Sequence, residues 1–259
     1  MPTEKRQRKR AGRNARLEAE RAAAKRAARR RKVTTAVIAT VAVFGILLLI
    51  SQTGGGGDGD QADTTDTTEQ DEAQAALYGA TPCAPETKPE EPDLSFDSPF
   101  EDCLEEDADY VAELTTADGT ITVDLLEEKA PGAVNNFVNL ARSGFYDGAP
   151  FHRVIEGFVA QGGDPVGQPP GTGGPGYAVA DELPDDGEYE IGSVAMANSG
   201  RDTQGSQFFI VTGPGGVDLP PQYTLFGTVT GGMDAVETIA PGEPPAEPTI
   251  IETVEIIMA

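Results

Sequence analysis

Two segments in the C-terminal half of the chain constrain the fold most strongly. Residues 151–165 read FHRVIEGFVAQGGDP and residues 195–209 read AMANSGRDTQGSQFF. Both combine short runs of β-branched or aromatic residues with glycine, which is typical of short strands joined by tight turns. The set of interest within them is Arg153, Gln161, Gln207, Asn198 and several aromatic rings, and it contains no catalytic nucleophile. That set suits a reaction in which no covalent bond is made or broken.

The two segments resemble the paired signatures of the cyclophilins, the cyclosporin-binding class of peptidyl-prolyl isomerases. The second contains an M-A-N run followed by G-S-Q-F-F. The resemblance extends over about residues 110–257 and is strongest to the membrane-anchored bacterial branch. It implies a mainly β fold, a closed antiparallel β-barrel capped by two α-helices. It also implies X-Pro isomerisation with no cofactor and no metal.

The resemblance implies that Arg153, Gln161 and Phe158 are the catalytic residues. Rotation about an X-Pro bond is slow because resonance gives the C–N bond double-bond character, with a barrier of about 18–20 kcal/mol. In the twisted transition state the prolyl nitrogen regains a lone pair, so a donor aimed at it acts only there. A charged donor such as Arg153 could contribute about 1.5–3 kcal/mol. This role requires that Arg153 face the pocket and not be locked to a carboxylate.

The remaining positions that match the family pattern are expected to bind substrate. Phe158 would line an apolar pocket together with Val159, Phe209 and Leu219. Gln161 and Gln207 would orient Arg153 and form hydrogen bonds with the substrate. The backbone at Ala197 and Asn198 would hold the peptide. Taken singly, such residues are more often solvated arginines or ordinary core aromatics. The predicted substrate-binding residues are Val159, Ala197, Asn198, Gln207, Phe209, Leu219 and Tyr223.

Several positions depart from the family pattern. The chain has no tryptophan, and Asp218 occupies the approximate position of the ring that lines the cyclosporin end of the pocket. Tyr223 stands where eukaryotic members carry histidine, Val159 where many carry methionine, and Glu156 where many carry proline. We therefore expect retained isomerase activity with weak cyclosporin binding.

His152 is the single histidine of the chain. Its ordinary pKa near neutrality would suit a general base. The alternation of side chains along a strand, however, places it on the face opposite Arg153. We therefore predict a packed or hydrogen-bonded structural histidine. We also interpret Gly162, Gly163, Asp164 and Gly205 as residues that shape backbone turns.

Periodicity predicts eight short strands and two helices. Apolar residues at helical spacing follow Pro131, and Gly144 marks a stop. Asp118-Gly119 marks a hairpin. The expected helices cover residues 130–143 and 233–239. The expected strands cover residues 110–116, 120–126, 151–155, 158–161, 192–196, 206–212, 224–229 and 249–257, with a Gly/Pro-rich excursion over 162–190.

The N-terminal third has a different composition. Residues 1–32 carry a net charge of +11 and the rest of the chain −35. Residues 33–50 form an uncharged apolar run of 18 residues, long enough to cross a bilayer. The positive-inside rule makes 1–32 a basic cytoplasmic tail and 33–50 a transmembrane signal-anchor of a single-pass cell-membrane protein, with the catalytic domain outside. A cleaved secretory signal is the alternative.

Residues 51–108 are acidic and rich in Gly, Thr and Pro, which predicts a flexible linker before an isomerase domain over 109–259. Cys83 and Cys103, the chain's two cysteines, lie on the predicted outer side, where oxidising conditions favour a disulfide. Free thiols and metal ligands are the alternatives. A structural bridge would hold the end of the linker against the domain.

Charge and motif together narrow the function. The acidity outside the membrane favours solubility or a saline medium, and it predicts a monomer that avoids nucleic acid. The basic tail would contact anionic lipid. The leading hypothesis is a peptidyl-prolyl cis-trans isomerase that assists extracytoplasmic folding of proline-containing unfolded or extended polypeptides. A non-catalytic proline-peptide-binding module or holdase is the alternative, and a structural envelope protein comes third.

Overall fold

A computed structural model describes residues 76–106 and 108–258, all within one compact unit, Glu69–Ala259. The predictions of a cytoplasmic tail, a transmembrane helix and the first part of the linker fall outside these residues. Within the described ranges, no helix is both long and apolar enough to cross a bilayer.

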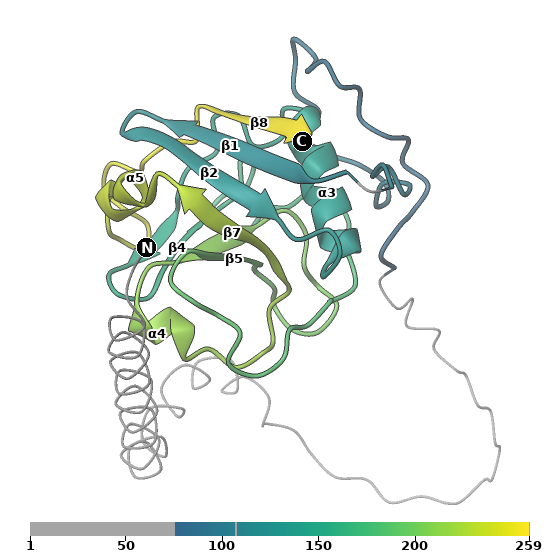
Figure 1. Cartoon of the computed structure of the whole chain (residues 1–259). Coiled ribbons are helices and arrows are strands. Elements are labelled where there is room, and N and C mark those ends of the chain that lie inside the picture. The colour runs from purple at the N-terminus through teal and green to yellow at the C-terminus, as the bar shows by residue number, and fades with distance from the viewer. Residues whose placement is uncertain (1–75, 107, 259) are drawn as a thin grey trace, which may run out of the picture. The chain divides into compact units, whose positions relative to one another are not determined.

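One antiparallel sheet of eight strands curls around the core (Figure 1). The strand order is β3-β4-β6-β5-β7-β2-β1-β8. Each predicted strand is present, with ends shifted by a few residues. The strands are β1 Tyr110–Thr116, β2 Gly119–Leu125, β3 Arg153–Ile155, β4 Val159–Gly162, β5 Ser193–Met196, β6 Phe208–Val211, β7 Leu225–Gly231 and β8 Thr253–Met258.

The barrel is not closed, contrary to our prediction. In the described sheet β3 and β8 are the two end strands and do not pair with each other. Isolated bridges, Val154 to Gly242 and Pro150 to Ile250, join the segment before β8 to the β3 side. This segment carries four prolines between 241 and 248, and proline has no N–H to donate to a strand ladder. The sheet is therefore a half-barrel.

The interior of the half-barrel is an apolar core. Along β1 the residues alternate between buried and partly exposed, and Leu114 points inward. Aromatic rings fill the centre, where Phe137 packs against Phe208 and Phe226 at centroid distances of 5.7 and 5.1 Å. This core fixes one face of every strand and leaves the opposite face available for a site.

Among the described residues, three helices accompany the sheet. The two predicted ones are α3 (Pro131–Arg142) and α5 (Met233–Thr238), which lie at opposite ends of β1 and β2 (Figure 1). The short α4 (Pro214–Val217) was not predicted. Glu182 accepts hydrogen bonds from two backbone N–H groups in the first turn of α3, where a negative charge also complements the helix dipole. Burial raises the pKa of this carboxyl.

Residues 76–106, here called the N-terminal strap, pack on the half-barrel. Phe100 is buried in the core, and Leu94 and Phe96 pack against it. The strap backbone bonds to the domain, for example from the Ala84 N–H to Asn139 Oδ1 at 2.9 Å. For these residues the predicted flexible linker is wrong, because the apolar side chains between the prolines and acids anchor the segment. The predicted disulfide forms between Cys83 and Cys103 and joins two parts of the strap that are 20 residues apart in the sequence.

Candidate active site

A row of paired residues crosses the outer face of the sheet. The register pairs Arg153 with Gln161, Gln161 with Phe209, and Phe209 with Ala195, on β3, β4, β6 and β5. Directly paired residues point to the same face of a sheet. Their sequence neighbours, including Val154 and Phe208, point into the core. Strand alternation therefore places the predicted polar and apolar site residues together.

Apolar side chains gather beside this row, and we call this group the notch; it consists of Phe158, Val159, Phe209, Leu219 and Tyr223. Val159 and Phe209 belong to a second buried hydrophobic cluster, separate from the core, and the other three side chains pack against it. Val159 and Phe209 are buried at its base. The Tyr223 ring stands edge-on to Phe209 at 5.3 Å between centroids. The structure thus gathers the predicted pocket residues into one surface that could receive a prolyl ring.

Arg153 lies at the edge of the notch. Its Cζ atom is 5.9 Å from the centroid of the Phe158 ring, within the range of a cation–π contact. Its Nε donates a hydrogen bond to Glu243 Oε1 at 2.7 Å. The two side chains are 39% and 53% exposed, and exposed ion pairs contribute only about 0–1 kcal/mol. Glu243 therefore does not lock the guanidinium away from a substrate.

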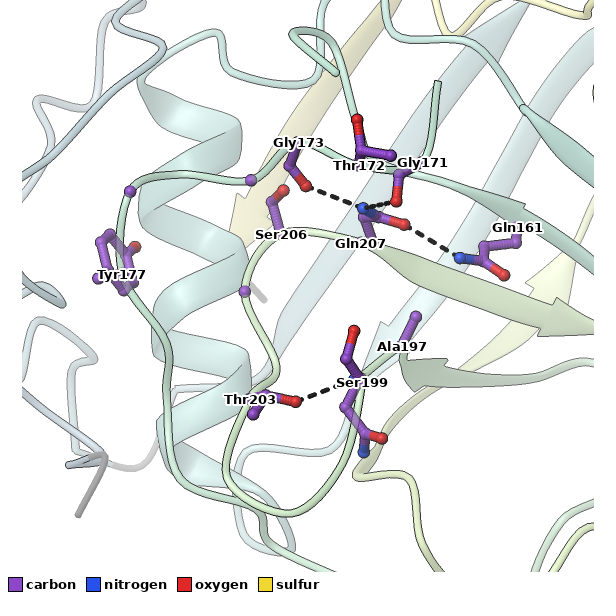
Figure 2. Close-up of a pocket in the computed structure, with 14 residues that line it drawn as sticks. Gln161, Gly171, Thr172, Gly173, Tyr177, Ala197, Ser199, Thr203, Ser206 and Gln207 are labelled. Carbon is purple, nitrogen blue, oxygen red and sulfur yellow. Dashed lines mark hydrogen bonds between the residues drawn. The ribbon is translucent and has the colours of Figure 1, made fainter. Parts of the chain in front are cut away.

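The two glutamines are linked to each other instead of to Arg153. Gln161 Nε2 donates to Gln207 Oε1 at 3.0 Å. Gln207 Nε2 in turn donates to the carbonyls of Gly171 and Gly173 at 3.0 and 2.8 Å (Figure 2). Among the described residues, the hydrogen bond of Arg153 goes to Glu243. The predicted role of the glutamines in orienting Arg153 is therefore not seen.

A polar pocket of about 660 Å³ adjoins the notch. Figure 2 shows that its walls come from the loop around Gly171–Tyr177 and from the segments around Ala197–Ser199 and Thr203–Gln207. Gln161 and Ala197 belong to the walls of the pocket and also adjoin the notch. The pocket is lined by Gln161, Gly171, Thr172, Gly173, Gly174, Gly176, Tyr177, Ala197, Asn198, Ser199, Thr203, Gly205, Ser206 and Gln207.

The buried carboxylate of Asp164 organises the loop of this pocket. It accepts four backbone hydrogen bonds, of which those from Gly167 and Gly171 are 2.7 Å and that from Gly173 is 2.8 Å. Burial alone would raise its pKa, but the four N–H donors outweigh burial and lower the pKa. A Cβ at Gly167 or Gly173 would collide with the carboxylate. Our interpretation of Asp164 as a turn residue missed this wider role.

The backbone at Ala197 and Asn198 borders both the notch and the pocket. The Ala197 N–H already donates to the Gln207 carbonyl at 2.8 Å. A grip on a peptide at Ala197 must therefore use its carbonyl oxygen. The Asn198 side chain donates to the Gln222 carbonyl at 2.8 Å and accepts from the Gly200 N–H, which holds the Asn198 turn in place.

His152 is 5% exposed and packs under the pocket loop, against the backbone position of Gly171. Neither ring nitrogen has a hydrogen-bond partner among the described residues. Burial lowers the pKa of His152, although the negative charge of Asp164 partly offsets this. A buried, neutral ring agrees with the structural role that we predicted.

Two residues of the site were not found from the sequence. Glu243 lies in the proline-rich stretch before β8, and no pattern there points to Arg153. Tyr177 donates its hydroxyl hydrogen to Asn136 Oδ1 at 2.6 Å and forms part of the pocket wall.

Asp218, the residue at the approximate tryptophan position, is exposed at the end of α4. Within residues 76–106 and 108–258, no cluster of three or more metal-binding side chains occurs.

Comparisons with known proteins agree with this geometry. The family model for the cyclophilin type peptidyl-prolyl cis-trans isomerases matches residues 111–257. A peptidyl-prolyl cis-trans isomerase of Helicobacter pylori is 46% identical over 138 residues, covering 51% of this chain and 81% of that protein. Peptidyl-prolyl cis-trans isomerase B of Bacillus subtilis is 48% identical over 124 residues, covering 48% and 85%.

Solved structures give the same result. A cyclophilin type peptidyl-prolyl cis-trans isomerase of Cryptosporidium parvum matches with a TM-score of 0.51 and 30% identity, over 57% of this chain and 98% of that one. The same protein, crystallised in the presence of the dipeptide Ala-Pro, matches with a TM-score of 0.50. The curled sheet and its outer notch thus define a cyclophilin-like domain. The chain belongs to the cyclophilin type peptidyl-prolyl cis-trans isomerase family.

Proposed function

We propose that this chain accelerates cis-trans isomerisation of X-Pro bonds in unfolded or extended polypeptides. The observation that carries the proposal is the Arg153 guanidinium beside the apolar notch, 5.9 Å from the Phe158 ring. Family membership and the isomerase relatives support it. A structure of a related protein solved in the presence of Ala-Pro supports a proline-containing ligand.

The geometry suits catalysis by differential binding. The notch would hold the prolyl ring against Phe209 and Phe158, which fixes one side of the imide bond. Rotation of the acyl side breaks the amide resonance, so a lone pair localises on the prolyl nitrogen and can accept a hydrogen bond from Arg153 only in the twisted state. A bond of about 1.5–3 kcal/mol made only in the twisted state accelerates rotation roughly ten- to a hundredfold. The apolar wall adds to this because the twisted amide is less polar than the planar one.

We further propose a membrane-anchored protein of the bacterial branch whose isomerase domain lies outside the cytoplasm. The basic segment 1–32, the apolar run 33–50 and the acidic remainder support this topology. The disulfide between Cys83 and Cys103 is in keeping with an oxidising compartment. Protease treatment of intact cells tests it: an external domain is digested, and a protected domain would contradict the proposal.

The competing function is a holdase that grips proline segments without catalysis. The polar pocket favours it, because carbonyl and hydroxyl groups there could bind an extended peptide without any twisted state. Refolding of a proline-limited protein separates the two functions. An isomerase raises the rate of the slow phase in proportion to its concentration. A holdase suppresses aggregation and leaves that rate unchanged.

A further inference from the structure

A carboxylate contacts the Arg153 guanidinium at the edge of the notch. Glu243 Oε1 accepts the Arg153 Nε hydrogen at 2.7 Å. Glu243 lies between α5 and β8, 90 residues along the chain from Arg153, so the contact depends on the tertiary fold. The contact also leaves the rest of the guanidinium available.

The backbone beside Glu243 is anchored to the strand that carries Arg153. Gly242 accepts a hydrogen bond from the Val154 N–H at 2.8 Å and donates one to the Val154 carbonyl at 2.9 Å. Gly242 has a φ of +149°, and a Cβ there would come 2.5 Å from Pro245 Cα. Glu243 and Arg153 are thus each one residue away from a doubly hydrogen-bonded pair. The backbone of Glu243 is therefore fixed relative to Arg153, unlike that of an acidic residue on an unanchored loop.

The identity of the bonded nitrogen matters for the chemistry. Arginine has five N–H donors, and the Nε–H is one of them. A carboxylate on Nε leaves the four N–H groups of Nη1 and Nη2 for a substrate. The Cζ atom also lies over the Phe158 ring. The guanidinium is therefore held by a carboxylate and by an aromatic ring, while its terminal nitrogens remain available.

We propose that Glu243 is a positioning residue for the isomerisation reaction, acting through Arg153. It limits the rotation of the guanidinium so that a terminal N–H meets the prolyl nitrogen when the X-Pro bond is twisted. This inference rests on the proposed function. Because the donor acts in the twisted state, loss of positioning lowers kcat more than it changes KM. An exposed ion pair contributes only a little free energy, so the expected loss in kcat is about two- to fivefold.

The test uses the full chain and a proline tetrapeptide followed by NMR exchange, which gives kcat and KM separately. Glu243→Ala removes the acceptor, and Glu243→Gln keeps an acceptor oxygen without the charge. Glu247→Ala is the matched control, since Glu247 is exposed in the same segment and makes no ion pair among the described residues. We expect kcat about two- to fivefold lower in Glu243→Ala, largely recovered in Glu243→Gln, and unchanged in Glu247→Ala.

A double-mutant cycle with Arg153→Ala decides whether Glu243 acts through Arg153. Positioning predicts that Glu243→Ala has no further effect once Arg153 is absent. An equal loss in both backgrounds, an unchanged or raised kcat in Glu243→Ala, or a Glu243→Gln variant as impaired as Glu243→Ala would overturn the inference. An inactive wild-type chain would overturn the proposed function itself. Thermal unfolding of each variant checks that the fold is intact.

Discussion

The notch and the polar pocket are neighbours, yet they are built by different means. The notch consists of side chains on strands β4 and β6 and the segments beside them. The pocket consists largely of loop backbone, held by the Asp164 carboxylate and by Gln207. Changes that loosen loops should therefore alter the pocket and spare the notch. Changes to Arg153 should instead alter the function of the notch and leave the pocket unchanged.

Loss of the disulfide should have the largest effect on stability. The bridge joins residues 20 apart, which corresponds to roughly 3 kcal/mol in the chain-entropy model. The strap contacts the pocket wall, where the Phe96 N–H bonds to the Pro175 carbonyl at 2.8 Å. We expect the Cys83→Ser/Cys103→Ser variant to unfold at lower urea concentration, while kcat at 25 °C changes little.

Reductant should reproduce this loss in the wild type and leave the double variant unaffected. A parallel collapse of kcat under conditions where the variant is fully folded would show that the notch depends on the strap.

Replacing Asp164 with asparagine should have the next largest effect. Asn keeps one oxygen but cannot accept all four backbone hydrogen bonds, and bonds to a charged group contribute about 1.5–3 kcal/mol each. We expect a loss of about 2–3 kcal/mol in the free energy of unfolding on this basis, with faster hydrogen exchange at Gly171 and Gly173. Asp186→Asn, at an exposed position, is the control. Unchanged exchange in Asp164→Asn would refute the role of the carboxylate in the pocket loop.

Gln207→Ala tests the link between the two regions. The substitution removes two bonds to glycine carbonyls and one from Gln161. Partial replacement by water leaves a net loss of about 1–2 kcal/mol. We expect KM for a proline peptide to rise several-fold, with a smaller change in kcat. Gln222→Ala, whose backbone carbonyl binds Asn198, is the control. A pure kcat effect would mean that Gln207 belongs to the notch.

The smallest effect concerns His152, whose pKa is lowered by burial. The unfolded chain then takes up a proton more readily than the folded one, so stability is lost as the pH falls below about 6.5. Glu182 has a raised pKa, so its contribution to the stability of the fold falls as the pH rises above the ordinary pKa of a glutamate. The comparison of wild type with His152→Asn isolates the histidine. We expect the difference in Tm between the two proteins to be constant above pH 7. Below pH 6, the Tm of the wild type should fall relative to that of the variant. A constant difference throughout would contradict a buried neutral ring.

Much of the notch could be predicted from the sequence. The family resemblance predicted Arg153, Gln161 and Phe209 as site residues, and strand alternation predicted that His152 lies on the face opposite Arg153, because side chains along a strand alternate with a period of two. The two main helices followed from apolar spacing, with Pro131 at the start of α3.

The misses have physical causes. The pocket depends on which N–H groups surround Asp164 and on the approach of Phe96 to Gly176, and such long-range backbone contacts leave no local pattern. The strap was mistaken for a linker because prolines and acids dominate its composition, while a few aromatic side chains determine its packing. The half-barrel arises because prolines before β8 prevent a continuous ladder.

The isomerase rate of Arg153→Ala tests the central claim most directly. In a protease-coupled or NMR exchange assay we predict that kcat/KM falls about ten- to a hundredfold, the equivalent of one charged hydrogen bond in the twisted state. Arg142→Ala, at the end of α3, should match the wild type. An Arg153→Ala variant that isomerises the peptide at the wild-type rate would contradict the account.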